Sequence, residues 1–145
     1  MAVNNKVPVT LASIVNEAES KKTAKAQAEV LIANKSPALK AVIGHAMDPG
    51  VTWLLPETDP PYRPMPKAMD QEASLASKIR MFEYLIAGPV GDNVKQTKRE
   101  EIFIQLLESI DPDDAVLLLR LKNKKLNLKP EAVKIAFPGV AKNWP

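Results

Sequence analysis

The sequence predicts an all-α fold, a compact bundle of six to eight short helices with an extended proline-rich strap at about residues 49–68. Apolar residues recur at helical spacing in several segments, and capping signals precede most of those segments. No segment alternates polar and apolar residues as a half-buried strand does. With 145 residues, 46% hydrophobic and 26% charged, the chain is predicted to form one domain, residues 1–145, with a flexible N-terminus at residues 1–9.

Three short helices are predicted in the N-terminal half. Thr10 is a capping residue in front of a helix over about residues 11–19. A second helix, over residues 23–33, is rich in alanine and other strong helix formers. Ser36 and the proline that follows it introduce a third helix, over residues 37–47. The apolar side of the second helix is predicted to consist of Ala24, Ala28, Leu31 and Ile32.

The run from Trp53 to Pro66 contains five prolines, a tryptophan and a tyrosine. Proline fixes φ, lacks the N–H donor and restricts the residue before it, so this run can be neither a helix nor a central strand. Its apolar start, around Trp53 and Leu55, would be costly to leave in water. We therefore interpret residues 49–68 as an ordered connection, pinned by Trp53 and Tyr62 across the helical halves, with no partner for a strand.

The longest helix is predicted to follow the strap. This helix is predicted to begin at residues 69–72 and to end at Gly88-Pro89, because glycine followed by proline is typical of a helix C-terminus. Its apolar side is predicted to consist of Leu75, Ile79, Phe82 and Ile86. Residues 89–96, which include Gly91, Asp92 and Asn93, are predicted to form a mobile loop.

Three more helices are predicted beyond that loop. Residues 97–100, Thr-Lys-Arg-Glu, fit the capping box and introduce an amphipathic helix that ends near Ile110. Asp111-Pro112 introduces a central, buried helix to about Lys122, because its residues are apolar nearly all the way round. A final short helix is predicted over residues 130–136.

The sequence offers no catalytic or metal-binding pattern, so the protein is predicted to be no enzyme, with no cofactor and no metal. It has no cysteine and one histidine, which excludes thiolate zinc sites and disfavours histidine-based ones. His45 has no acidic neighbour in the sequence and is interpreted as a structural or surface residue. Asp111, Asp113 and Asp114 lack the spacing of a calcium loop and are interpreted as helix-capping residues.

The segment from Pro60 to Pro64 resembles a polyproline ligand for an aromatic-lined groove. The alternative, which we favour, is that it packs across the protein's own helices. Trp144 near the end of the chain either docks on the core or holds a partner. The candidate protein-binding residues are therefore Trp53, Pro60, Pro61, Tyr62, Arg63 and Trp144.

The net charge of +3 is unevenly distributed, because residues 121–145 contain six lysines and one glutamate, a net +5. A basic patch of this size attracts nucleic acid or an acidic protein surface. Lysines at a helix C-terminus also complement the helix dipole, and this is the interpretation we favour. The candidate nucleic-acid-binding residues are Lys122, Lys124, Lys125 and Lys129.

Several segments together resemble a known family. These are Ser36-Pro37-Ala38-Leu39-Lys40, Asp48-Pro49, Trp53-Leu54-Leu55-Pro56-Glu57, Asp59-Pro60-Pro61-Tyr62-Arg63-Pro64 and the run from Lys98 to Ile110. Over about residues 10–140 the chain is similar to a family of small conserved proteins of large contractile-tailed phages and cyanophages. That family has no assigned activity, so the resemblance implies a phage protein made in a bacterial host and transfers no site residue.

These observations lead to one expected function and two alternatives. We expect a non-enzymatic phage accessory protein that binds a host or phage protein during infection. The alternatives are association with nucleic acid through the basic C-terminal region and a role as a minor virion component. The expected location is the cytoplasm of the infected bacterial host, with the virion as the second candidate, and no contact with a membrane is expected.

Overall fold

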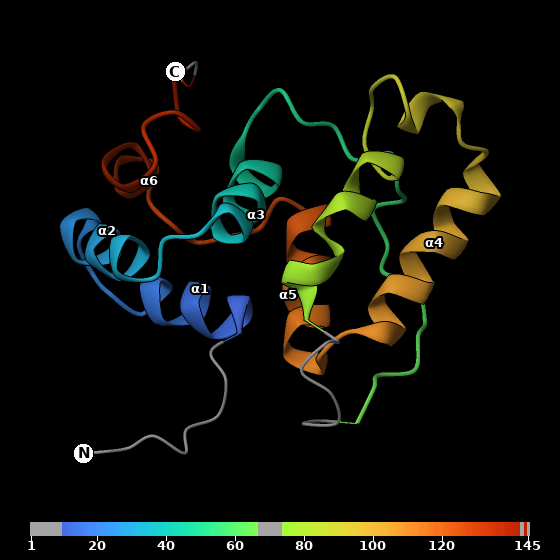
Figure 1. The fold of residues 1–145 in the computed structure, drawn as a ribbon, viewed down its shortest axis with the longest axis horizontal. Helices are drawn as coiled ribbons and strands as arrows, with labels where there is room; N and C mark the ends of the chain where they lie inside the picture. Colours follow the sequence, from blue (N-terminus) through green and yellow to red (C-terminus); the bar gives the residue numbers. More distant parts are fainter. Residues whose placement is uncertain (1–9, 67–73, 143, 145) are drawn as a thin grey trace.

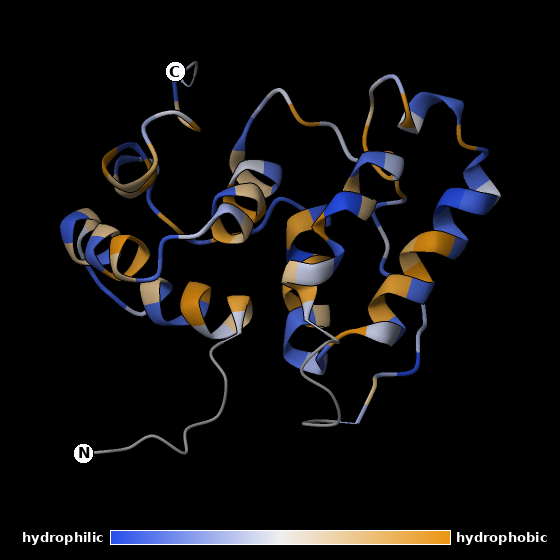
Figure 2. Ribbon diagram, viewed as in Figure 1, coloured by the Kyte–Doolittle hydropathy of each residue, from blue (hydrophilic) through white to orange (hydrophobic). Residues whose placement is uncertain are grey.

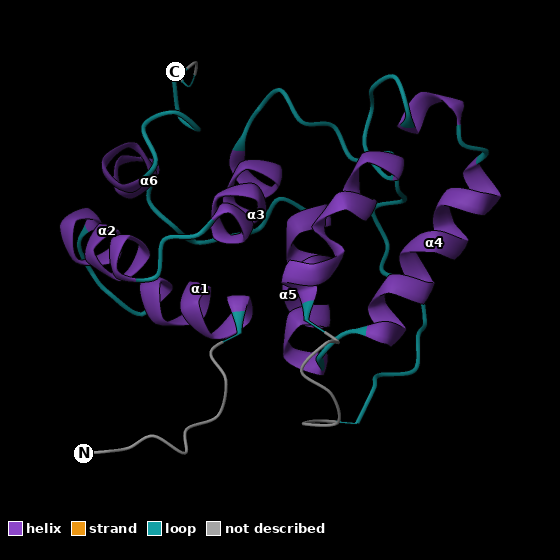
Figure 3. Ribbon diagram, in the orientation of Figure 1, coloured by secondary structure: helices purple, strands orange, loops and turns teal. Residues whose placement is uncertain are grey.

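The computed structural model describes residues 10–66, 74–142 and 144. Within these residues the chain forms six α-helices and two 3₁₀ helices, and no strand (Figures 1 and 3), which confirms the all-α prediction. The helices are α1 (Leu11–Glu19), α2 (Ala24–Ala33), α3 (Pro37–Met47), η1 (Leu75–Tyr84), η2 (Gly91–Asn93), α4 (Gln96–Ser109), α5 (Pro112–Lys122) and α6 (Pro130–Ala136). The strap is described from residue 49 to residue 66, and the predicted flexible N-terminus lies outside the described residues.

The central helix is α5, as predicted. It packs against α1 and α3 on one side and α4 on the other, while α2 contacts both α1 and α6 (Figure 1). Along α1, α4 and α5 hydrophobic stretches alternate with hydrophilic ones (Figure 2), as expected of helices with one buried side. Leu117, Leu118 and Leu121 are buried, but Val116 is 52% exposed, so α5 has one solvent-facing side.

The first three helices each begin after a capping residue; the caps predicted at Thr10 and Ser36 are confirmed, whereas Thr23, assigned to the second helix itself, is the cap of that helix. The Thr10 hydroxyl accepts a hydrogen bond from the Ser13 N–H at 3.0 Å, and Thr23 and Ser36 cap α2 and α3 in the same way. Each cap satisfies a backbone donor that the first helical turn leaves unpaired. The residue boundaries predicted for the first and third helices are therefore confirmed.

The predicted apolar side of α2 is wrong at Ile32, which is 48% exposed. Gln27 is buried instead, and its side-chain oxygen accepts from the Lys129 N–H, at the start of α6, at 2.8 Å. Its amide nitrogen donates to the Lys21 carbonyl at 3.3 Å. Because α2 turns this polar residue inward to bind the backbone of α6, Ile32 is turned outward.

The helix after the strap differs from its prediction. Residues 69–72 lie outside the described residues, and from Leu75 the chain forms a 3₁₀ helix of 10 residues rather than the longest α-helix. Ser74 caps it by accepting from the Ser77 N–H, and the helix ends at Tyr84, before Ile86. The longest helix is α4, with 14 residues. The buried residues Leu75 and Phe82 are seven positions apart, a spacing that places two side chains on one side of an α-helix but about a third of a turn apart in a 3₁₀ helix, so the sequence spacing favours the α-helix.

The capping box predicted at Thr97 is not formed. Helix α4 begins one residue earlier, at Gln96, and Lys95 at its N-cap makes no side-chain cap hydrogen bond. The Gln96 amide donates to the Glu100 carboxylate at 2.7 Å. Glu100 therefore bonds to a side chain of its own helix instead of reaching back to a cap.

The predicted mobile loop, residues 89–96, contains η2 and is attached to α4 through Arg99. This arginine is 6% exposed, and its Nη2 donates to the Gly91 carbonyl at 2.8 Å and the Val94 carbonyl at 2.7 Å. A charged guanidinium with two backbone acceptors is a strong restraint on a short loop.

A buried carboxylate, Asp114, joins the starts of three helices. It is 1% exposed, and its two oxygens accept from the Ala12 N–H at 3.0 Å, in α1, and from the Leu75 N–H at 3.1 Å, in η1. Burial raises the pKa of Asp114, and the two backbone hydrogen bonds act in the opposite direction. The sequence identified Asp114 as a charge in the first turn of α5, but its main contacts are with two other helices.

We predict that Asp114→Ala destabilises the protein by about 2–4 kcal/mol, because two buried N–H groups would lose their acceptor. Urea denaturation followed by circular dichroism measures this loss. The control is Glu131→Ala, an exposed acid in the first turn of α6, for which we expect a loss below about 1 kcal/mol. Equal losses in the two variants would contradict the role assigned to Asp114.

Candidate functional site

The beginning of the strap is paired with the segment that follows η1. The Leu54 N–H donates to the Leu85 carbonyl at 2.8 Å, and the Ala87 N–H donates to the Thr52 carbonyl at 2.8 Å. These two bonds flank an isolated antiparallel bridge between Trp53 and Ile86. The extended piece therefore has a partner, contrary to the sequence prediction, because Ile86 lies beyond the helix to which the sequence assigned it.

Trp53 is an anchor of the strap. Its indole N–H donates to the His45 carbonyl at 2.9 Å, near the end of α3. Its ring meets those of His45 and Phe82 edge to face, with centroids 6.0 Å and 5.6 Å away. The His45 Nδ1 lies 2.7 Å from the Ala41 carbonyl, which can only accept, so this nitrogen carries the proton. Both rings thus have structural roles, and among residues 10–66 and 74–142 no carboxylate is found in contact with His45.

Lys122, the last residue of α5, holds the middle of the strap. Only 1% of its side chain is exposed. Its ammonium group donates to the carbonyls of Pro56 at 3.0 Å, Glu57 at 3.3 Å and Thr58 at 3.3 Å. Since proline-rich backbone forms no internal hydrogen bonds, its carbonyls need donors from elsewhere, and Lys122 supplies them.

Asp59 adds an ion pair to this contact. Its carboxylate lies 3.0 Å from the Lys122 ammonium and accepts from the Asn123 amide at 3.0 Å. The hydrogen bond from Asn123 lowers the pKa of Asp59, Lys122 adds to this effect, and partial burial opposes it. The side chain of Asp59 remains 49% exposed.

The far part of the strap is bound to α4, where the Arg63 N–H donates to the Glu108 carboxylate at 2.8 Å. Side chains here differ in exposure. Pro60, Tyr62 and Met65 are half-buried, and Pro61, Arg63 and Pro64 are exposed. Burial, with a smaller effect of Asp59, raises the pKa of Tyr62. Trp53, Leu55 and Tyr62 pack against the core, which confirms the predicted packing.

Three of the four lysines predicted to attract nucleic acid, Lys122, Lys124 and Lys125, line one groove, but their ammonium groups differ in burial and in what they contact. Lys122 is buried against the strap and is unavailable to a phosphate group. The Lys124 ammonium donates to the Asp48 carbonyl at 2.6 Å, and burial lowers the pKa of Lys124. Lys125 and Lys129 are exposed residues. The sequence could not separate these lysines, because their burial depends on where the strap lies.

A groove of about 460 Å³ brings together the two sets of candidate residues. Residues 51–53 and 55–57 of the strap line one part of it, and residues 122–125 line the other. Trp53 thus shares one surface with Lys124 and Lys125, which the sequence analysis treated as separate. The segment from Pro60 to Arg63, Lys129 and Trp144 are not part of the groove.

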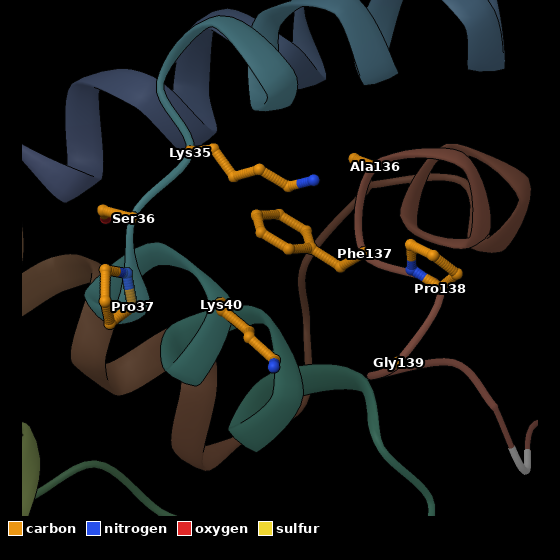
Figure 4. A pocket seen from close by; sticks show the side chains of 8 residues that line it. All are labelled: Lys35, Ser36, Pro37, Lys40, Ala136, Phe137, Pro138 and Gly139. Carbon is orange, nitrogen blue, oxygen red and sulfur yellow. The ribbon is translucent and has the colours of Figure 1, made fainter.

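A second hollow, of about 530 Å³, lies between the α2–α3 connection and the end of α6 (Figure 4). The Lys35 ammonium lies 5.4 Å from the centroid of the Phe137 ring, and Lys40 is also part of the lining. The Ser36 hydroxyl is occupied in capping α3. No sequence pattern indicates this hollow, because it depends on how α6 packs against α2.

Trp144 lies against the core and is half-buried. Its backbone N–H donates to the Ala141 carbonyl at 3.1 Å, and its indole nitrogen is buried with no hydrogen-bond partner among the described residues. Of the two roles considered for this tryptophan, the structure shows docking on the core.

The described part of the chain holds neither a metal-binding cluster nor a membrane span. No group of three or more histidine, aspartate or glutamate side chains there could hold a metal ion. No helix there is long and apolar enough to cross a membrane.

Comparison with known proteins gives one match. The model of a family of unknown function, DUF6433, matches residues 14–128, and the chain therefore belongs to this family. No curated protein and no solved structure matches the chain. The matched residues include the strap, α4 and α5, and so Asp114, Lys122 and the strap carbonyls that Lys122 binds, whereas Ala12, one of the two donors to Asp114, lies just outside them.

We predict that Lys122→Met lowers the free energy of unfolding by about 1–3 kcal/mol, because three strap carbonyls and Asp59 lose their donor. Urea denaturation measures the change. The control is Lys125→Met, an exposed lysine of the same groove, for which we expect a change within about 0.5 kcal/mol. A Lys122 variant as stable as the wild type would contradict the role of Lys122 as the main donor to the strap.

We also predict a pH dependence that comes from Asp59. Because its pKa is lowered in the folded protein, its contribution to stability is complete above the unfolded pKa of about 4 and is lost as the pH falls through the lower folded value. The wild type should therefore lose more stability than Asp59→Asn between about pH 5 and about pH 3. Asp114 titrates in both proteins, so its effect cancels in the comparison. Parallel stability curves would exclude an ionic contribution from Asp59.

Proposed function

We propose that this member of the DUF6433 family is a non-enzymatic binding protein that contacts another protein through the outer side of its strap. The observation that carries the proposal is the division of side chains along residues 60–65. Tyr62 packs against the core and Pro60 and Met65 are half-buried, whereas Pro61, Arg63 and Pro64 are exposed. The strap is thus anchored by one side and presents the other.

The anchoring favours binding because it removes conformational freedom before a partner arrives. The strap is held at its start by Trp53, in its middle by Lys122 and at its far part by Glu108. A segment already fixed in its bound conformation loses less entropy on association, which raises affinity without new contacts. Exposed prolines and an arginine on extended backbone suit a partner with an aromatic-lined groove.

The proposal includes the setting expected from the sequence. Two of the segments that resemble proteins of large contractile-tailed phages, residues 53–57 and 59–64, lie within the strap. We therefore propose that the partner is a host or phage protein and that binding takes place in the cytoplasm of an infected bacterium. A virion component remains the second candidate, which mass spectrometry of purified particles tests.

The nucleic-acid alternative has less support. Of its four lysines, Lys122 is buried against the strap, and Lys129 lies outside the groove that Lys124 and Lys125 line. Binding of nucleic acid through phosphate contacts needs several cations free at one surface. The absence of a catalytic role is likewise part of the proposal, and the contacts of His45 with Ala41, Trp53 and Phe82 support it.

We predict that a partner recovered from infected cells with the wild-type protein is lost with the variant Pro61→Ala, Arg63→Ala, Pro64→Ala. Three exposed contacts at the centre of an interface are expected to change the affinity by about tenfold or more. Affinity capture followed by quantitative mass spectrometry measures the recovery.

The control is Lys25→Ala, Glu29→Ala, two exposed residues on α2, which should recover the partner as the wild type does. Capture of no protein partner, or equal recovery with the strap variant, would count against the proposal.

A further inference from the structure

We propose that the groove between the start of the strap and the end of α5 binds an extended acidic peptide segment of a partner protein. This groove has a volume of about 460 Å³ and is lined by Val51, Trp53, Leu55 and Pro56 on the strap and by Lys124 and Lys125 beyond α5. It combines unpaired backbone groups, apolar side chains and positive charge. These features favour a ligand that is extended, partly apolar and acidic.

The backbone at Trp53 offers a strand edge. The hydrogen bonds of Thr52 and Leu54 with the segment 85–87 flank the pair Trp53–Ile86. In such a non-hydrogen-bonded antiparallel pair, the N–H and C=O groups of the residue point away from the opposite strand. Neither group of Trp53 has a hydrogen-bond partner among the described residues. An extended peptide can add here as a further strand through main-chain hydrogen bonds.

The positive charge of the groove favours a peptide of negative charge. Three of its lining residues are lysines, and Glu57 is the one acid among them. Asp59 pairs with Lys122, so Lys124 and Lys125 supply the positive charge near the strand edge. Glutamate or aspartate side chains on alternate residues of a peptide strand would meet these two lysines, while the residues between them face Leu55 and Pro56.

A peptide fits this groove better than a nucleic acid does. Stacking of a base needs an available aromatic face, but the Trp53 ring packs edge to face with His45 and Phe82, and its N–H is bound to the His45 carbonyl. What this residue still offers is its backbone N–H and C=O, which pair with no described residue and to which an added strand can bind.

The test uses synthetic peptides of about eight residues. The probe alternates valine and glutamate. One comparison peptide alternates valine and lysine, a second carries proline at its central position, and a single-stranded oligothymidylate of equal charge represents nucleic acid. Titration into the ¹⁵N-labelled full chain at low salt, followed by amide chemical shifts, locates and measures binding.

We expect the valine–glutamate peptide to bind with a Kd of about 1 mM or tighter and to shift the amides of Trp53 and Lys125. The lysine and proline peptides should bind about tenfold more weakly, because one repels the groove and the other lacks a strand donor. Lys125→Glu should weaken binding about fivefold, whereas Lys129→Glu, an exposed lysine outside the groove, should not.

The inference is overturned if the glutamate peptide does not bind, if the proline or lysine peptide binds equally well, or if oligothymidylate binds more tightly. Shifts confined to the hollow around Lys35 and Phe137 would also overturn it. The variant with alanine at positions 61, 63 and 64 should bind the peptide as the wild type does. The outcome is therefore independent of the proposed function of the outer side of the strap.

Discussion

The structure depends on the burial of one helix, α5, which carries a charged side chain into the interior at each end. An ion removed from water is tolerated only where polar groups replace its hydration. At the start of α5, Asp114 receives the N–H groups of Ala12 and Leu75. At its end, Lys122 donates to the carbonyls of residues 56–58 and pairs with Asp59. The hydrogen bonds that Asp114 and Lys122 need fix α1, η1 and the strap relative to the central helix. The packing of α3 and α4 fills the space between these segments.

The position of the strap follows from the same need for hydrogen-bond partners, in this case the need of the strap's own carbonyl groups. A proline-rich chain can pair few of its own backbone groups, so its carbonyls need donors from side chains or water. Lys122 satisfies three of these carbonyls from one side, which leaves the opposite side free to carry Pro61, Arg63 and Pro64. The strap is therefore ordered and still exposes these three side chains. The groove beside it is a consequence of the same docking, since it forms where the beginning of the strap passes the residues that follow α5.

Local signals in the sequence predicted much of the fold. Thr10, Ser36 and Asp111 each cap the helix expected of them, because capping depends on residues three or fewer positions apart. The contacts that shape the site join residues far apart in the chain. Asp114 bonds to a residue 102 positions away and Lys122 to one 66 positions away, and neither partner is a side chain that a motif could reveal. The errors have the same origin. Ile32 is exposed because Gln27 binds the backbone near α6, and Thr97 is no cap because Gln96 occupies Glu100.

The central claim is that the strap is an ordered part of the helical domain, held by α5 and open on its outer side. Backbone ¹⁵N relaxation tests it most directly, because order parameters report motion on the picosecond to nanosecond timescale at each amide. The account predicts order parameters of about 0.8 or above for Thr58, Asp59, Tyr62 and Arg63, close to those of α5. Values below about 0.6 at these residues, with α5 still rigid, would show a flexible linker and contradict the account.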